Sequence, residues 1–374
     1  MLGLAMALHS SPKVLMIDEL SLGLAPAVVE RLLPVIKRIA ENGTAVIVVE
    51  QSVNLALTIA DRAYFMEKGQ IRFSGSTKDL LERPDLLRSV FLSQVNASPL
   101  GAKELSGPTS AVTLSAEALT RRFGGIQAVS SISFNVKEKE IVGVMGPNGA
   151  GKTTLFDLLS GFVPVDSGKV QLQNRDITTS SPAERARFGL GRSFQDARLF
   201  PSLTVSETIA VALERFTASR NPVSAALHLP RTYESEKSVT RQVAELIEVM
   251  GLGAYQNKFI GELSTGTRRM VDLACVIAHR PLVVLLDEPS SGIAQKEAEA
   301  LIPVLQRIRD EMGSSLVVIE HDIGLLSEIS DRFIALDQGS VIARGTPEEV
   351  LDDPLVISSY LGTSKATIQR SGQI

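Results

Sequence analysis

The chain has 374 residues, of which 44% are hydrophobic and 21% charged, the balance of a globular protein that can bury a core. At roughly 150 residues per domain, this length predicts two or three domains. The net charge of −4 provides no global basic field that would favour nucleic acid or an anionic membrane surface, whereas backbone amides can still bind phosphate locally.

Cysteine and histidine content and the lengths of the apolar runs bear on location and metal binding. The single cysteine, Cys275, lies in an apolar stretch, so we expect a buried, inert thiol and no disulfide within the chain. The four histidines show no metal-ligand spacing, which predicts no zinc site. No apolar run reaches the ~20 residues of a membrane-spanning helix, and the apolar start lacks a basic leader. We therefore expect a cytosolic protein that serves any membrane from outside the bilayer.

The first 93 residues contain a pattern that returns later in the chain. Val14–Glu19 matches Val283–Glu288 at an offset of 269 residues, and Val48–Gln51 matches Val318–His321 at an offset of 270. Five further landmarks match at nearly the same spacing: Asp61-Arg62 with Asp331-Arg332, Gly69 with Gly339, Gly75 with Gly345, Pro84 with Pro354, and Pro34 with Pro303. Seven landmarks at nearly one offset indicate an internal repeat.

The two copies differ in extent. The first copy, residues 1–93, matches only the last third of the second copy, residues 111–362. Residues 94–110 are rich in Ser, Gly, Ala and Pro and predict a flexible linker, and residues 363–374 predict a short polar tail. Because Met1 aligns with Met270, we expect the first copy to be the C-terminal part of a longer repeat.

The second copy supplies the elements of an α/β fold. The expected elements are antiparallel strands in 127–136, buried parallel strands at 141–145, 283–286 and 316–319, a helix over 152–161, and a mostly helical segment over 203–279 that the polar residues 217–235 interrupt. Together they predict a parallel α/β core with an antiparallel β attachment and an inserted helical subdomain.

A glycine-rich segment between a predicted strand and a predicted helix fits the phosphate-binding loop G-x-x-x-x-G-K-[ST]. Its glycines let backbone amides surround phosphate, and the helix N-terminus adds a positive dipole end. Lys152 can reach the β- and γ-phosphates, and the Thr153 hydroxyl can ligate Mg²⁺. The residues expected to bind ATP here are Gly146, Pro147, Asn148, Gly149, Ala150, Gly151, Lys152, Thr153 and Thr154.

Two adjacent carboxylates end the predicted strand 283–286. Beside a phosphate loop, Asp287 would hold the Mg²⁺ shell and Glu288 would polarise the attacking water. The nearest match to a guanine-reading Asn-Lys-x-Asp motif, residues 257–260, lacks the aspartate, which disfavours a GTPase.

A short polar segment opens the predicted helix that runs to Ala278. It comprises Leu263, Ser264, Thr265, Gly266 and Thr267. Ser264, the Gly266 amide and the helix N-terminus can form a second anion site. By itself such a segment is usually a helix cap, but its place 21 residues before Asp287 favours the anion site.

Three single residues have two interpretations each. His321 follows a buried strand and is either structural or a hydrogen-bond partner of a γ-phosphate. Gln195 lies between the phosphate loop and the segment at Ser264 and could be an ordinary surface amide. Phe123 precedes the phosphate loop and could stack on adenine or lie in the core.

Residues 112–362 resemble the nucleotide-binding domain of an ATP-binding-cassette (ABC) transporter, with 263–267 in the place of the family's signature Leu-Ser-Gly-Gly-Gln. Within that family they most resemble the ATP-binding subunits of importers for branched-chain, hydrophobic amino acids. The supporting segments are Phe123-Gly-Gly125, Gly191-Arg-Ser-Phe-Gln195, the polar insert after Phe216 and Tyr360-Leu-Gly362. The first copy, with Leu22-Gly-Leu-Ala-Pro26 and Val49-Glu-Gln-Ser52, resembles the sister subunit.

The resemblance implies a P-loop NTPase fold that uses ATP and Mg²⁺. It implies that Phe123 stacks on adenine, that Gln195 senses Mg²⁺ and couples to the membrane subunits, and that His321 is the switch histidine. It also implies that Ser264 and Gly266 bind a partner domain's γ-phosphate. The expected partners are a second ABC ATPase domain, transmembrane permease subunits and, indirectly, a substrate-binding protein, on the cytoplasmic face of the plasma membrane; no nucleic acid is expected.

Departures from the family pattern are few but specific. Thr265 and Thr267 replace a glycine and a glutamine of the signature, and Ala294 replaces an aspartate in the loop after Pro289. The first copy has no phosphate loop and no signature, so we expect no ATP binding there. Two alternative functions stay open: an exporter ATPase such as that of lipopolysaccharide export, and a soluble, non-transport ABC ATPase.

Overall fold

The computed structural model describes residues 6–7, 12–18, 20, 26–50, 53–67, 69–78, 111–194, 199–216, 230–293 and 295–361. Its chain forms two compact units. The first comprises residues 1–96, 146–149 and 351–374, and the second comprises residues 97–145 and 150–350. Gln195, Ala294, the predicted linker 94–110 and the predicted tail 363–374 lie outside the described residues.

A six-stranded sheet forms the centre of the second unit. In spatial order its strands are β10 (Leu190–Arg192), β11 (Val283–Asp287), β12 (Ser315–Ile319), β7 (Ile141–Met145), β13 (Arg332–Asp337) and β14 (Ser340–Gly345). Neighbouring strands are parallel except for the antiparallel pair β13 and β14. Every residue of β7, β11 and β12 is buried, as expected for apolar strands covered on both faces. The predicted buried parallel strands are therefore confirmed.

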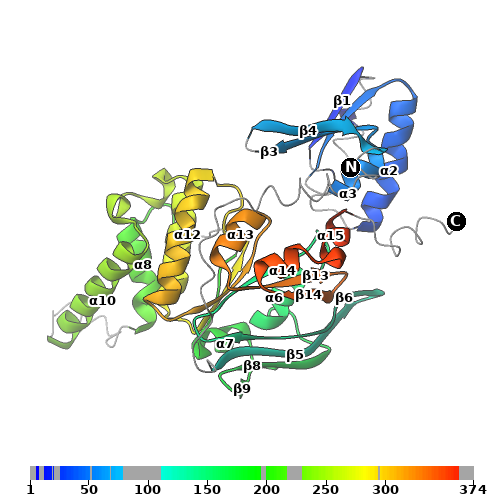
Figure 1. Cartoon of the computed structure of the whole chain (residues 1–374). Coiled ribbons are helices and arrows are strands. Elements are labelled where there is room, and N and C mark those ends of the chain that lie inside the picture. Colours follow the sequence, from blue (N-terminus) through cyan, green and yellow to red (C-terminus); the bar gives the residue numbers. More distant parts are fainter. Residues whose placement is uncertain are drawn as a thin grey trace. The chain divides into compact units, whose positions relative to one another are not determined.

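A four-stranded antiparallel sheet packs on the same core. Its spatial order is β6 (Ile126–Lys137), β5 (Val112–Phe123), β8 (Ser167–Leu172) and β9 (Arg175–Asp176). The helix α6 (Lys152–Ser160) contributes Leu155, Phe156 and Leu158 to a single core that includes residues of both sheets. Figure 1 shows the antiparallel sheet in teal and green. This arrangement fixes the start of α6, and hence the phosphate loop, against the centre of the fold.

Several helices accompany the two sheets of the second unit. They include α8 (Val205–Leu213), α10 (Pro230–Val249), α11 (Thr265–Ala278), α12 (Gln295–Asp310), α13 (Ile323–Ile329) and α7 (Pro182–Phe188). Helix α11 packs against α8, α10 and α12. The predicted break at 217–235 is wrong at its end, because α10 begins at Pro230, and proline is compatible with a first helical turn. Residues 217–229 lie outside the described residues.

The first unit contains two small sheets. Strand β1 (Val14–Asp18) pairs in parallel with β2 (Ala45–Val49), and β3 (Arg62–Glu67) pairs antiparallel with β4 (Gln70–Ser76). The helices of this unit are α2 (Pro26–Glu41), α3 (Val53–Ile59) and, from the end of the chain, α15 (Pro354–Leu361); α14 (Pro347–Leu351) precedes α15. Its apolar clusters are small, one around Leu32 and Ile36 and another around Leu57 with Ile357.

The elements of the first unit follow those of the second at a constant offset. Strands β2, β3 and β4 and helix α3 each begin 270 residues before β12, β13, β14 and α13. Even the register shift between Phe65 and Met66 recurs between Ala335 and Leu336. In the second unit β7 lies between β12 and β13, whereas among the described residues of the first unit no strand joins β2 to β3. The repeat is thus visible in the fold as well as in the sequence.

Within the described part of the chain, no helix combines the length and apolar character that crossing a membrane requires.

Candidate nucleotide site

The phosphate loop connects the buried strand β7 to α6. Gly149 and Gly151 have φ of 81° and 97°, a left-handed conformation that glycine adopts at little cost. A Cβ added to Gly151 would collide with the carbonyl oxygen of Ala128, so the glycine is required for space as well as for conformation. As N-cap of α6, Gly151 supplies no side-chain cap, which suits the amides of the first turn to an anion.

Lys152, the first residue of α6, is held in a buried position. Its side chain is 7% exposed, and burial lowers the pKa of its ammonium to about 8, although Glu288 and Asp287 act in the opposite direction. A phosphate bound in the loop would attract this desolvated ammonium strongly, because charge interactions strengthen in low dielectric.

Asp287 ends β11 with a buried carboxylate of which one oxygen has no hydrogen-bond partner among the described residues. Its Oδ2 lies 3.6 Å from Arg192 Nη2, while Oδ1 is the buried atom without a partner. Burial raises the pKa of Asp287, and Arg192 opposes this shift. An unpaired buried carboxylate oxygen fits a hard, oxygen-binding cation such as Mg²⁺. Thr153 lies exposed on the first turn of α6.

Among the described residues, no cluster of three or more His, Cys, Asp or Glu side chains could hold a metal ion. Mg²⁺ typically binds through one or two protein groups together with water and phosphate, so a magnesium site does not require such a cluster.

Glu288 is held in a strained backbone conformation beside His321. Its φ is 49°, uncommon for a residue with a side chain, and its amide donates to Ile319 O at 2.9 Å. Its Oε1 lies 2.8 Å from His321 Nε2. Such strain costs about 1–3 kcal/mol and persists where the surroundings enforce it, often at functional sites. The structure therefore brings together two residues that the sequence could only place in the same region.

A buried carboxylate fixes the loop that follows Glu288. Glu320 is 3% exposed and accepts hydrogen bonds from the Ser290 amide at 2.7 Å and the His321 amide at 3.2 Å. Burial raises the pKa of Glu320, while these amides lower it. Glu320 thereby ties the position of His321 to the loop after Pro289.

The predicted signature segment forms the start of α11. Ser264 is its N-cap, with Oγ accepting from the Thr267 amide at 3.1 Å and donating to Glu297 Oε1 at 2.6 Å. A Cβ added to Gly266 would lie 2.5 Å from Glu297 Oε2. The structure therefore shows Ser264 as a helix cap. The same hydroxyl also holds a carboxylate oxygen of Glu297 at the N-terminus of α11. Leu263 is buried just before this turn, and Thr265 is the first residue of the helix.

Phe123 lies at the end of β5 with 45% of its surface exposed, which excludes a core role. The Arg121 guanidinium lies 4.8 Å from the centre of its ring.

Cys275 is half-buried instead of fully buried as expected, and burial raises the pKa of its thiol to about 12, which agrees with an inert thiol.

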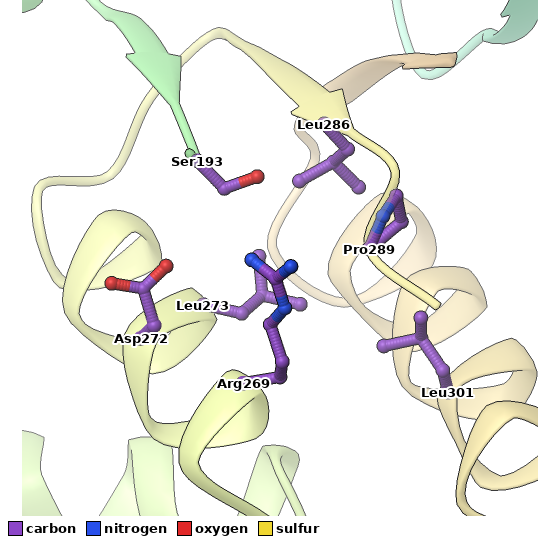
Figure 2. Close-up of a pocket in the computed structure, with 7 residues that line it drawn as sticks. All are labelled: Ser193, Arg269, Asp272, Leu273, Leu286, Pro289 and Leu301. Atoms are coloured by element: carbon purple, nitrogen blue, oxygen red, sulfur yellow. The ribbon is translucent and has the colours of Figure 1, made fainter. Parts of the chain in front are cut away.

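Figure 2 shows a small cavity between α11 and the end of β11. Its volume is about 10 Å³, room for about one water molecule, so it is too small to be the nucleotide site. The lining side chains are Ser193 after β10, Arg269, Asp272 and Leu273 of α11, Leu286 and Pro289 around the end of β11, and Leu301 of α12. Burial raises the pKa of Asp272 to about 6, with Arg269 opposing the shift.

Arg192 belongs to the site, although its sequence position within the segment Gly191–Gln195 predicts no role for it. Its side chain is 8% exposed and reaches Asp157 on α6 as well as Asp287. A buried arginine cannot be recognised from spacing alone, because the acidic partners lie on elements distant in the sequence.

Comparison with known proteins defines the class of the chain. Residues 129–291 match the family model described as ABC transporter, and residues 340–366 match the model described as branched-chain amino acid ATP-binding cassette transporter. The chain belongs to the family of ABC transporter ATP-binding proteins, which are ATPases. The resemblance predicted from the motifs is confirmed.

Individual relatives are transport ATP-binding proteins. The chain is 36% identical over 249 residues to the high-affinity branched-chain amino acid transport ATP-binding protein BraF of Pseudomonas aeruginosa, an alignment covering 67% of this chain and 97% of BraF. It is 34% identical, with the same coverage, to LivG of Escherichia coli K12.

Solved structures show the same fold. An ATP-binding cassette of an ABC transporter in its ADP conformation is similar, with a TM-score of 0.58 and 26% identity, covering 67% of this chain and 99% of that chain. A dimeric cassette in a post-hydrolysis state bound to ADP and Pi has a TM-score of 0.51 and 25% identity, covering 63% and 98%. The predicted fold class is confirmed.

Proposed function

We propose that the second copy, residues 111–362, binds MgATP and hydrolyses it to drive a membrane importer for branched-chain or other hydrophobic amino acids. One observation carries the hydrolytic part. Glu288 follows Asp287 in the chain and contacts His321, and the buried Oδ1 of Asp287 has no hydrogen-bond partner among the described residues. Lys152, buried and influenced by both carboxylates, supplies the matching positive charge.

The roles of the phosphate-binding residues follow from their chemistry. The amides of Gly146–Thr154 and the Lys152 ammonium bind the β- and γ-phosphates, and the half-exposed Phe123 stacks on adenine. Thr153, Asp287 and Gln195 would hold the magnesium shell. The bound ion would supply positive charge that offsets negative charge on the phosphates.

Glu288 acts as the general base in this proposal. It accepts a proton from the attacking water, while His321 holds the carboxylate at Oε1 and hydrogen-bonds the γ-phosphate in the closed state. Since a general base contributes typically about 10²–10⁴-fold, its removal should stop turnover without removing the phosphate contacts.

The site requires a second cassette. One domain provides the phosphate loop and carboxylates, and the Ser264 and Gly266 anion site belongs to the same domain, so the two cannot close on one nucleotide. A related cassette forms a dimer bound to ADP and Pi, which supports pairing with a second chain or a sister subunit. The negatively charged Glu297 held at Ser264 supports an anion-accepting role for this turn.

Transport is supported by relatives named for branched-chain amino acid transport and by the family model matched at 340–366. On this proposal the chain is peripheral to the cytoplasmic face of the plasma membrane and works with transmembrane permeases and, indirectly, a substrate-binding protein. The first copy, residues 1–93, is a partial cassette repeat that adds no second nucleotide site, as supported by its constant offset from the second copy and its lack of a phosphate loop.

Calorimetric titration and phosphate release test the hydrolytic proposal on the full chain. Wild type should bind one ATP per chain, and Glu288→Gln should keep its ATP affinity within about threefold while hydrolysis falls about 10²–10⁴-fold. Glu311→Gln, at an exposed carboxylate paired with Arg307, serves as the matched control and should hydrolyse normally. Undiminished hydrolysis in Glu288→Gln would contradict the general-base assignment, and two ATP per chain would contradict the assignment of the first copy.

Uptake of labelled leucine, isoleucine and valine tests the transport proposal in cells. Deleting the encoding gene should lower uptake, and Glu311→Gln but not Glu288→Gln should restore it. Unchanged uptake of all three amino acids after deletion would exclude branched-chain amino acids as the cargo.

A further inference from the structure

One buried arginine links the three elements that carry the site. Arg192, the last residue of β10, donates from Nη1 to Asp157 Oδ1 and to Ser160 Oγ, each at 2.7 Å and both on α6. Its Nη2 lies 3.6 Å from Asp287 Oδ2 at the end of β11. A single guanidinium thus connects the phosphate-loop helix, the carboxylate strand and the strand that leads toward Gln195.

Aromatic rings cover this ion-pair cluster. The Arg192 guanidinium carbon lies 5.5 Å from the centre of the Phe162 ring and 5.0 Å from that of Phe194, and the two rings meet edge to face at 5.5 Å. Cation–π contact and exclusion of water both strengthen a charge interaction. With 8% of its side chain exposed, Arg192 is a fixed group of the interior and not a solvated surface charge.

The two oxygens of Asp287 have different surroundings. Oδ2 faces Arg192, and Oδ1 is buried with no hydrogen-bond partner among the described residues. Asp157 and Ser160 on α6 fix the other end of the guanidinium through Nη1. Arg192 can therefore hold the Asp287 carboxylate in one orientation through Oδ2.

We propose that Arg192 is a positioning residue that holds the Asp287 carboxylate through Oδ2, leaving Oδ1 directed to the magnesium shell. This inference rests on the proposed MgATP hydrolysis. Arg192 itself touches neither nucleotide nor metal. A purely structural Arg192 would tie α6 to β10 through Asp157 and Ser160 but would leave the magnesium dependence of nucleotide binding unchanged.

The test measures ADP affinity by calorimetry, with Mg²⁺ at increasing concentration and with EDTA, so that no hydrolysis intervenes. Loss of an outer-shell partner typically costs about 10–100-fold in metal affinity. Arg192→Met should therefore raise the half-saturating Mg²⁺ concentration at least about tenfold, while ADP affinity in EDTA stays within about twofold of wild type. Arg192→Lys, which keeps the charge but loses the planar fork, should give an intermediate shift.

A matched control separates positioning from stability. Arg332→Met removes another partly buried arginine of the same unit, one paired with Glu140 at 3.0 Å, and should lower stability without altering magnesium dependence. The signal of bound Mn²⁺ in electron paramagnetic resonance provides a second readout, which should broaden in Arg192→Lys even if Arg192→Met fails to fold.

Each outcome decides between two claims. If wild type shows no magnesium-dependent nucleotide binding, the proposed function fails. If wild type shows it and both Arg192 variants match Arg332→Met in magnesium dependence and in the Mn²⁺ signal, the function stands and the positioning role of Arg192 is refuted.

Discussion

Lys152 is the residue whose charge state most directly links the geometry of the site to nucleotide affinity. Its side chain is 7% exposed, and burial lowers the pKa of its ammonium to about 8. The β- and γ-phosphates require the protonated form, so above about pH 8 binding must first return a proton to Lys152. ATP affinity should consequently fall by up to about tenfold per pH unit between about pH 8 and pH 10, equivalent to about 1.4 kcal/mol per unit.

Calorimetry of MgATP binding measures this effect directly. The Glu288→Gln variant prevents turnover, and titrations in two buffers of different ionisation enthalpy reveal proton uptake, expected near half a proton per ATP at about pH 8. Lys152→Arg is the matched control, because a guanidinium stays protonated throughout this range. Equal pH dependence in the lysine and arginine forms, or binding with no proton uptake at about pH 8, would refute the assignment of a buried, nucleotide-linked Lys152.

Two substitutions within α11, at Asp272 and Gly266, probe the charge and the shape of this helix. Asp272→Asn should stabilise the protein by about 1–3 kcal/mol at about pH 7.5, because the folded-state pKa of about 6 lies above the ordinary 3.8. The gain in the free energy of unfolding from Asp272→Asn should therefore vanish below about pH 4 and be complete above about pH 6, as measured by urea unfolding at several pH values. An equal gain at all pH values would contradict ionisation of the buried Asp272 carboxyl as its cause. Gly266→Ala gains about 1 kcal/mol of helix propensity, but its methyl group must displace Glu297 Oε2. Stability should change by less than about 1 kcal/mol while phosphate release falls at least about tenfold, and full activity would contradict a functional role for this turn.

Local motifs made the chemistry of this fold predictable from the sequence. The phosphate loop needs a left-handed backbone at Gly149 and Gly151, which glycine adopts at little cost, and Gly151 also packs too closely on Ala128 to carry a side chain. The strand before the loop needs an unbroken apolar run because both its faces are covered. Such requirements act over a few residues, so they leave a direct trace in the sequence. The same holds for the carboxylates that end β11.

Contacts between distant elements could not be predicted in this way. Arg192 contacts Asp157 and Asp287 only because β10 pairs with β11 and lies near α6. No spacing of residues in the sequence predicts these contacts. Glu297 reaches Ser264 for the same reason, from a helix that follows the carboxylate strand. The helix start at Pro230 was missed because a polar, proline-containing stretch is typical of a loop, although proline also suits a first turn.

The two copies show why the strand that leads to the phosphate loop matters for packing as well as for chemistry. Met16 and Ile47 of the first unit are 73% and 50% exposed, whereas Leu285 and Val317, their equivalents in the second, are fully buried. In the second unit β7 fills the place between β12 and β13, and α6 covers the core beside it. Burying a large apolar side chain contributes about 1.5–3 kcal/mol, so the segment that supplies Lys152 also supplies burial to its neighbouring strands. In this fold, therefore, the nucleotide site and the stability of the central sheet depend on the same strand and helix.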